Sequence, residues 1–367
     1  MRVPFLDLKV KPKDRKKLLT KFDKVLKGGK IINGKDQIIL EKKISVLTGF
    51  KYALCVGSGS SALYLALRAN GIKNNDEVIT TPFSWIITSN AISATGAKPI
   101  FVDIDENFNI DPNKIEKAIT KKTKAIVPMH VGGKLCNMEK ILDIAKKNRL
   151  KVIEDAAQSF SSFKKNNKFE TFSDSKAFSF NPMKVLHAYG EAGAVTTNDE
   201  KVYQKMRQLR HAGTIRKDIK DRINVCYHYS LNHKIDTIQC SFLLENLKKL
   251  KSILKKRNNI CDYYRKHLKG PISFQKKEKG EVNTQYLFLA KFKLRDKLKS
   301  FLEKKNIESK IFYSPLIPDA PINRNLKKKK LENSRKLLKQ ALALPLHENL
   351  EINQIQYVVK NINKFYE

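Results

Sequence analysis

Three short segments of the chain carry residue types that could act on one bound ligand. The segment Gly57–Ser61 combines two glycines with three serines, directly after an apolar run that predicts a strand. Glycine lets a ligand approach the backbone, and the start of a following helix offers free N–H groups to a phosphate. Gly59, Ser60 and Ser61 are therefore candidate phosphate ligands. Taken alone, the segment is equally typical of an ordinary strand-to-helix turn.

The second segment, Glu154–Gln158, follows another predicted strand. A carboxylate at the position of Asp155 could keep a pyridine nitrogen protonated and make that ring an electron sink. Ala157 leaves room for a flat ring, and Gln158 can donate to a phenolic oxygen. Taken alone, Asp155 is better explained as the N-cap of a helix.

The third segment, Ser179–Lys184, overlaps the strand-like run at 177–180. A lysine that forms a Schiff base must be partly removed from water, because desolvation lowers the pKa of its ammonium group. Lys184 follows a predicted strand and precedes the glycine-bounded turn Gly190–Gly193. Most lysines of this chain sit in polar, solvated contexts, so Lys184 is a candidate nucleophile only because of these neighbours.

Alternating strands and helices are expected to bring the three segments together. Short apolar runs predict strands at 53–56, 77–80, 99–102, 125–128, 151–154 and 194–197. Runs between them predict helices at 60–69, 85–94, 115–118 and 138–147. Strands separated by helices imply an α/β fold with a mostly parallel sheet, whose ligands bind at the carboxyl ends of the strands.

The remainder of the chain predicts a second, smaller unit. Residues 236–268 have one apolar face and predict a long helix. A strand at 285–289 and a helix at 296–304 follow. We expect a large domain at 1–245, N-terminal arm included, and a small C-terminal α+β domain at 246–367.

In their order along the chain, these motifs resemble the DegT/DnrJ/StrS family of nucleotide-sugar aminotransferases. This family belongs to fold type I of the enzymes that use pyridoxal 5′-phosphate (PLP). The resemblance covers nearly the whole chain, and the ordered combination is specific although each piece is not. The matching segments are Val3–Leu8, Asp76–Ile79, Gly96–Pro99 with Val102–Asp103, Ile153–Gln158, Ser179–Lys184 and Leu344–His347.

The resemblance implies a role for each candidate. The position of Lys184 forms the Schiff base with PLP, that of Asp155 pairs with the pyridine nitrogen, and that of Gln158 contacts the ring. Ser60, Ser61 and Ser179 stand where phosphate ligands are expected.

Two further residues follow from the resemblance alone. Trp85, the only tryptophan, stands where an aromatic ring stacks on the cofactor; the alternative is a core tryptophan. Asn232 matches an asparagine that reaches the phosphate of the partner subunit's cofactor, and the alternative is a loop or cap asparagine. The resemblance therefore implies a homodimer with shared active sites.

The activity implied is the transfer of an amino group, from glutamate, to the keto group of a nucleotide-diphosphate sugar for surface polysaccharide or glycan biosynthesis. Related dehydratases have histidine at the Schiff-base position, and Lys184 favours amino transfer over that alternative. Lys234 replaces a common arginine, and Ile311–Pro315 lacks the histidine that often precedes its tyrosine. Both departures concern the substrate pocket. His187 has no role in the family and is interpreted as structural.

Charge raises a third possibility from another class. The chain has 73 lysines and arginines against 36 acidic residues, a formal net charge of +37. This charge could bind nucleic acid. The lysines are spread along the whole chain, however, which favours solvated surfaces over a dedicated nucleic-acid interface.

Composition also bears on the compartment. The five cysteines are widely spaced and form no Cys-x-x-Cys pair, so we expect free thiols and no metal site. We find no signal peptide or membrane span, and we expect a soluble, cytoplasmic protein without a membrane partner.

Overall fold

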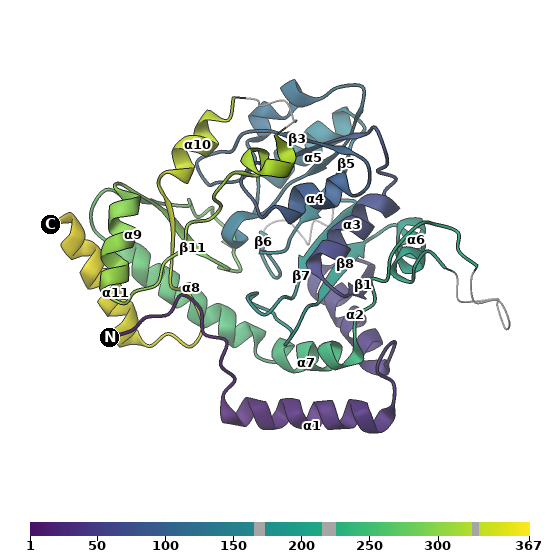
Figure 1. The fold of residues 1–367 in the computed structure, drawn as a ribbon, viewed down its shortest axis with the longest axis horizontal. Coiled ribbons are helices and arrows are strands. Elements are labelled where there is room, and N and C mark those ends of the chain that lie inside the picture. The colour runs from purple at the N-terminus through teal and green to yellow at the C-terminus, as the bar shows by residue number, and fades with distance from the viewer. Residues whose placement is uncertain (165–172, 215–224, 325–329) are drawn as a thin grey trace.

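Seven strands form one central sheet in the computed structural model, which describes residues 1–164, 173–214, 225–324 and 330–367 (Figure 1). They are β1 (Tyr52–Val56), β2 (Glu77–Thr80), β3 (Lys98–Phe101), β4 (Thr123–Val127), β5 (Lys151–Asp155), β7 (Ser175–Ser179) and β8 (Gly193–Thr197). Their order is β1-β8-β7-β5-β4-β2-β3. From β7 to β3 every pair is parallel. The predicted α/β fold with a mostly parallel sheet is confirmed.

Strand β8 departs from this parallel pattern, because it runs antiparallel to both β1 and β7. The connection from β7 to β8, residues 180–192, contains no helix. A strand that returns without a crossover helix pairs antiparallel to the strand before it. The same connection contains Lys184, so this lysine lies on a loop beside the end of β7.

Helices cover both faces of the sheet, because its strands are apolar on both sides. They include α3 (Gly59–Ala69), α4 (Ile87–Ser93), α5 (Met138–Lys147) and α6 (Glu200–Arg210). Ile153 of β5 packs in the core that α3, α4 and α6 cover. Its neighbour Val152 packs in the core beneath α5. Successive residues of a strand point to opposite faces, so Glu154 lies on the side of Val152 and Asp155 on that of Ile153.

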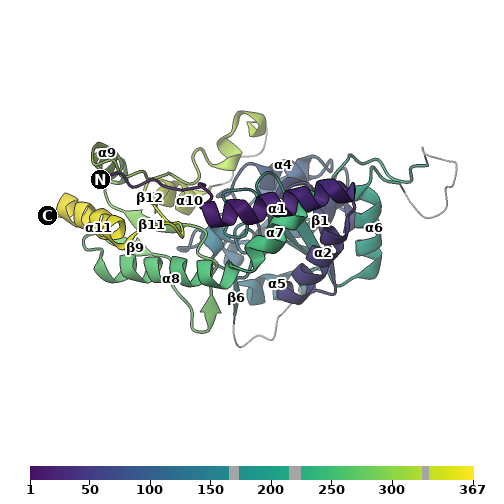
Figure 2. The ribbon, with the colours of Figure 1, turned by 90° about the horizontal axis from the view of Figure 1, so that it is seen from below.

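Four helices connect the central sheet with the C-terminal part of the chain. They are α1 (Pro12–Gly28), α2 (Lys35–Thr48), α7 (Thr237–Leu247) and α8 (Leu250–His267). Figures 1 and 2 show α1 on the outside of the molecule, alongside α7. The long helix predicted at 236–268 is interrupted at Lys248 and Lys249, between α7 and α8.

The C-terminal part contains a three-stranded antiparallel sheet. Its strands are β9 (Ile272–Phe274), β11 (Phe288–Phe292) and β12 (Ala341–Leu344), in the order β12-β11-β9. The helices α9 (Arg295–Lys304), α10 (Glu332–Leu338) and α11 (Ile352–Tyr366) belong to the same part. Val3 from the N-terminus is fully buried in this core. Across the described ranges, no helix combines the length and apolarity that crossing a membrane requires.

Two local predictions differ from the structure. The helix predicted at 115–118 is replaced by two 3-10 turns, Pro112–Lys114 and Glu116–Ala118. The strand predicted at 285–289 begins only at Phe288, because Gln285 has a left-handed φ of 53°. The carbonyl oxygens of Gln285 and Tyr286 accept hydrogen bonds from Arg257 instead of joining a sheet.

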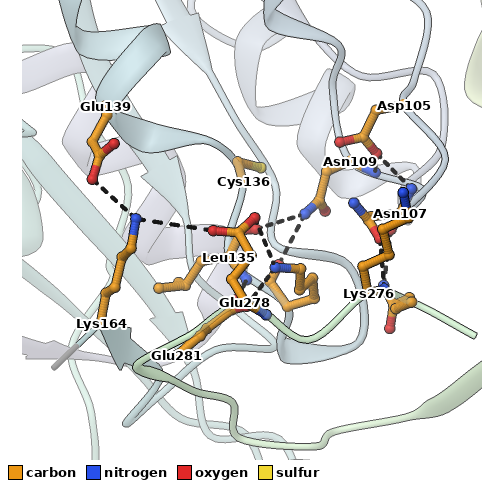
Figure 3. Close-up of polar contacts among 12 residues, drawn as sticks. Asp105, Asn107, Asn109, Leu135, Cys136, Glu139, Lys164, Lys276, Glu278 and Glu281 are labelled. Atoms are coloured by element: carbon orange, nitrogen blue, oxygen red, sulfur yellow. Dashed lines mark hydrogen bonds and ion pairs between the residues drawn. The ribbon is translucent and has the colours of Figure 1, made fainter.

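A short strand pair joins the C-terminal part to the loops around the central sheet. It consists of β6 (Phe163–Lys164) and β10 (Glu281–Val282). Lys164 lies between two carboxylates (Figure 3). Its Nζ is 3.1 Å from Glu139 and 3.9 Å from Glu278. Glu281 forms a buried ion pair at 2.5 Å with Lys134, which follows β4. This ion pair links the two parts, and loss of either partner would leave an uncompensated buried charge.

The start of β8 lies against the Gly57–Ser61 turn, and this contact generates a prediction about stability. A methyl group at Gly193 would overlap the carbonyl group of Ser58, which is backbone and cannot rotate away. Gly193→Ala should therefore lower the free energy of unfolding by about 1–3 kcal/mol, measured by urea denaturation.

The matched control is Gly28→Ala in α1, where an added methyl group would meet no atom within 4 Å. Its free energy of unfolding should change by no more than about 1 kcal/mol, toward higher stability. Equal stability of the two variants would contradict the proposed contact between β8 and the turn.

Candidate active site

A cavity of about 820 Å³ lies at the carboxyl ends of β5 and β7. Ligands of open α/β sheets bind at this edge. Of the ten residues predicted to contact the cofactor, eight line this cavity: Gly59, Ser60, Trp85, Asp155, Ala157, Gln158, Ser179 and Lys184. Ser61 lies just outside the lining, and Asn232 does not reach the cavity of its own chain.

Asp155 ends β5 as a nearly buried carboxylate, 7% exposed. Thr88 of α4 donates its hydroxyl to Asp155 at 2.7 Å, and the N–H of Ala157 donates at 3.2 Å. Burial raises the pKa of Asp155, against the opposing effects of these hydrogen bonds and of the charge on Lys184. No helix begins at residues 156–162, so the N-cap interpretation of Asp155 is wrong.

Glu154 points to the opposite face of the sheet and forms a separate network. Cys136 donates its backbone N–H to Nδ1 of His130, so the ring proton lies on Nε2, which donates to Glu154 at 2.8 Å. Lys176 lies 3.2 Å from the same carboxylate. Burial would raise the pKa of Glu154, but Lys176 and His130 hold it at about 2. Glu154 therefore supports β5 as a permanent anion behind the cavity.

Lys184 faces the cavity beside an aromatic ring. Its Nζ lies 4.3 Å from the centroid of the Tyr286 ring, and no hydrogen bond or ion pair of Nζ occurs among the described residues. Arg257 fixes Tyr286 by donating to the carbonyl oxygens of residues 285 and 286, both at 2.9 Å. Sequence reasoning missed Tyr286 and Arg257, because only tertiary contacts bring them to Lys184.

Gln158 is held at both ends of its side chain. Its oxygen accepts the N–H of Gly132 at 2.7 Å, and its nitrogen donates to the hydroxyl of Tyr313. Burial raises the pKa of Tyr313, which therefore stays protonated. Tyr313 belongs to Ile311–Pro315, the segment that departs from the family pattern, and the whole segment lines the cavity. The second hydrogen of the Gln158 amide remains available to a ligand.

The Gly57–Ser61 turn opens α3 at one end of the cavity. Ser58 is the N-cap of this helix and accepts the N–H of Ser61 at 3.1 Å. Gly59 packs so closely on Ser179 that a methyl group at this glycine would lie 2.6 Å from the Ser179 Cβ. Ser60 is exposed to the cavity. Free N–H groups and hydroxyls thus converge there, as an anion requires.

The structure also bears on the alternatives considered for Trp85, Asn232 and His187. Trp85 is 63% exposed and lines the cavity, so the core interpretation is wrong. Asn232 is exposed, next to Leu231 and close to Tyr229, whose exposed fractions are 72% and 93%. His187 lies 3.2 Å from the carbonyl oxygen of Lys184 and packs edge-on against Tyr189.

Known proteins are similar to this chain in sequence over nearly its whole length. A "Pleiotropic regulatory protein" of Geobacillus stearothermophilus is 34% identical over 100% of this chain and 99% of its own length. The dTDP-3-amino-3,6-dideoxy-alpha-D-galactopyranose transaminase of Aneurinibacillus thermoaerophilus is 33% identical over 99% of both chains.

Solved structures also share the fold of this chain. NtdA from Bacillus subtilis, solved with bound cofactor PMP, superposes with a TM-score of 0.91 at 30% identity, over 98% of this chain and 84% of that chain. The model of the DegT/DnrJ/EryC1/StrS aminotransferase family matches residues 12–363. The family resemblance predicted from the motifs is thereby confirmed, and the chain belongs to the DegT/DnrJ/EryC1/StrS aminotransferase family.

Proposed function

We propose that the chain is a PLP-dependent aminotransferase that joins the cofactor to Lys184 and moves an amino group from glutamate to a keto sugar on a nucleotide diphosphate. The observation that supports this most directly is the presence of Lys184 and Asp155 in one cavity. Family membership, the sugar transaminase among the relatives and the PMP-bound NtdA structure support the same assignment.

The residues of the cavity fit the cofactor in three respects. Ser60, Ser179 and the start of α3 offer donors for its phosphate. Asp155 is a buried acceptor for its ring nitrogen, and Lys184 is an amine without another partner among the described residues. When bound, PLP supplies a conjugated ring that takes up the electron pair left by a departing proton.

Each side chain then has a separate task. Asp155 would accept the N–H of the bound ring nitrogen and so keep that nitrogen protonated and the ring electron-poor. With the cofactor bound, Lys184 would act first as a general base and then as a general acid: its Nζ would take the proton from the donor's α-carbon, hold it and give it back. Tyr286 packs against Nζ of Lys184, and Trp85 lines the same cavity. A dehydratase of the same family remains the second enzyme candidate, and lysine at position 184 argues against it.

We also propose a homodimer in which Asn232 contacts the partner subunit's cofactor phosphate. The exposed apolar residues beside Asn232 support a covered surface there. The proposal includes a division into a large domain at 1–245 and a small domain at 246–367. It also includes a cytoplasmic location and a role in glycan biosynthesis. Five unpaired cysteines agree with a reducing compartment.

A labelling experiment tests the cofactor and the amino donor together. Borohydride added to the PLP-loaded protein should fix the cofactor on Lys184, identified by peptide mapping. Glutamate added first should abolish the label, because it releases the lysine. Lys184→Ala should lower the transamination rate by about 10²–10⁴-fold.

A label on another lysine would refute the assignment of Lys184. If borohydride still labelled Lys184 after glutamate had been added, glutamate would not be the amino donor. If glutamate had no effect while nucleic acid bound tightly at physiological salt, the nucleic-acid-binding alternative would replace the proposed enzyme.

A complementation experiment tests the shared active site. Lys184→Ala should be mixed with an inactive Asn232 variant under conditions that exchange subunits. A hybrid dimer then has one site with both residues intact, so part of the activity should return. Hybrids that form but stay inactive, or an active monomer, would exclude sharing; two Lys184→Ala preparations provide the control.

A further inference from the structure

His233 contacts the Gly57–Ser61 turn, which we propose binds the cofactor phosphate. Its Nδ1 is 2.9 Å from the hydroxyl oxygen of Ser61, and its ring packs against the ring of Tyr64. The N–H of Gly57 donates to the carbonyl oxygen of His233 at 2.9 Å. The histidine is therefore tied to both ends of the Gly57–Ser61 turn. No role was predicted for it from the sequence.

The surroundings of His233 determine where its ring proton lies. His233 is 9% exposed, and its Nε2 is buried with no hydrogen-bond partner among the described residues. Burial lowers the pKa of His233, so the ring is neutral and only one nitrogen has a proton. A buried N–H without an acceptor costs more than a bare ring nitrogen, so the proton belongs on Nδ1.

This tautomer fixes the direction of the hydrogen bonds at Ser61. The Nδ1–H of His233 donates to the Ser61 hydroxyl oxygen, and the Ser58 hydroxyl donates to the same oxygen at 3.1 Å. Both lone pairs of that oxygen are then occupied, and its own hydrogen is left without a protein acceptor. The hydroxyl can act only as a donor, next to Gly59 and Ser60 in the cavity wall.

We propose that His233 is a positioning residue that makes the Ser61 hydroxyl a dedicated donor to the cofactor phosphate. The proposal rests on the proposed function, because it requires PLP in this cavity. It assigns His233 an effect on one part of the cofactor only, the phosphate.

The test compares the binding of PLP with that of pyridoxal, which lacks the phosphate, to the full-length apoprotein. Fluorescence of Trp85, the only tryptophan and a residue of the cavity wall, reports both titrations. His233→Phe, and His233→Leu as a smaller second variant, should weaken PLP binding by about 10-fold and leave pyridoxal binding unchanged. His233→Asn, whose amide can donate from the position of Nδ1, should stay within about 3-fold of the unmodified protein.

A double-mutant cycle separates positioning from general support. Adding His233→Phe to Ser61→Ala should cause no further loss of PLP affinity, because the donor is already gone. The matched control adds His233→Phe to Ser60→Ala. There the fold-losses of PLP affinity of the two single variants should multiply. Equal losses for PLP and pyridoxal, or independent losses at 61 and 233, would overturn the proposal. An unmodified protein that binds neither ligand at Lys184 would instead overturn the proposed function.

Discussion

The buried carboxylate of Asp155 is the constraint on which the rest of the site depends. A charged group at 7% exposure loses most of its hydration, and its burial raises its pKa. Thr88 and the N–H of Ala157 compensate part of this cost. A protonated ring nitrogen would offset the remaining desolvation cost by pairing with the carboxylate. The buried Asp155 therefore favours binding of a protonated pyridine over a neutral one. Under the proposed function, the cavity would therefore favour a cofactor whose ring nitrogen is protonated.

Glu154, the neighbour of Asp155 in β5, helps to hold this strand and therefore Asp155 in position. Glu154 faces the other side of the sheet, where His130 and Lys176 hold it ionised. Parallel strands pair with β5 on both of its edges and hold it within the sheet. The loop with Lys184 then returns through the antiparallel strand β8, whose first residue packs on the Gly57–Ser61 turn. These contacts set the positions of Lys184, Asp155 and the Gly57–Ser61 turn relative to one another.

The sequence predicted those parts of the site that local motifs encode. Asp155 ends β5, Gln158 follows it and Lys184 follows β7, and the parallel topology places the ends of these strands at one edge of the sheet. Tyr286 was missed because it reaches Lys184 only through a fold-level contact that Arg257 maintains. His233 was missed for the same reason. The antiparallel direction of β8 was not predicted, because a short apolar run does not reveal the direction of its neighbours.

The protonation of the cofactor's ring nitrogen tests the central claim most directly. It can be measured by nitrogen-15 NMR on labelled PLP bound to the protein and to Asp155→Asn. The account predicts a protonated nitrogen in the unmodified protein at neutral pH, and an unprotonated nitrogen in Asp155→Asn, whose neutral amide cannot stabilise the cation. An unprotonated nitrogen in the unmodified protein, or the same chemical shift in both proteins, would contradict the role of Asp155.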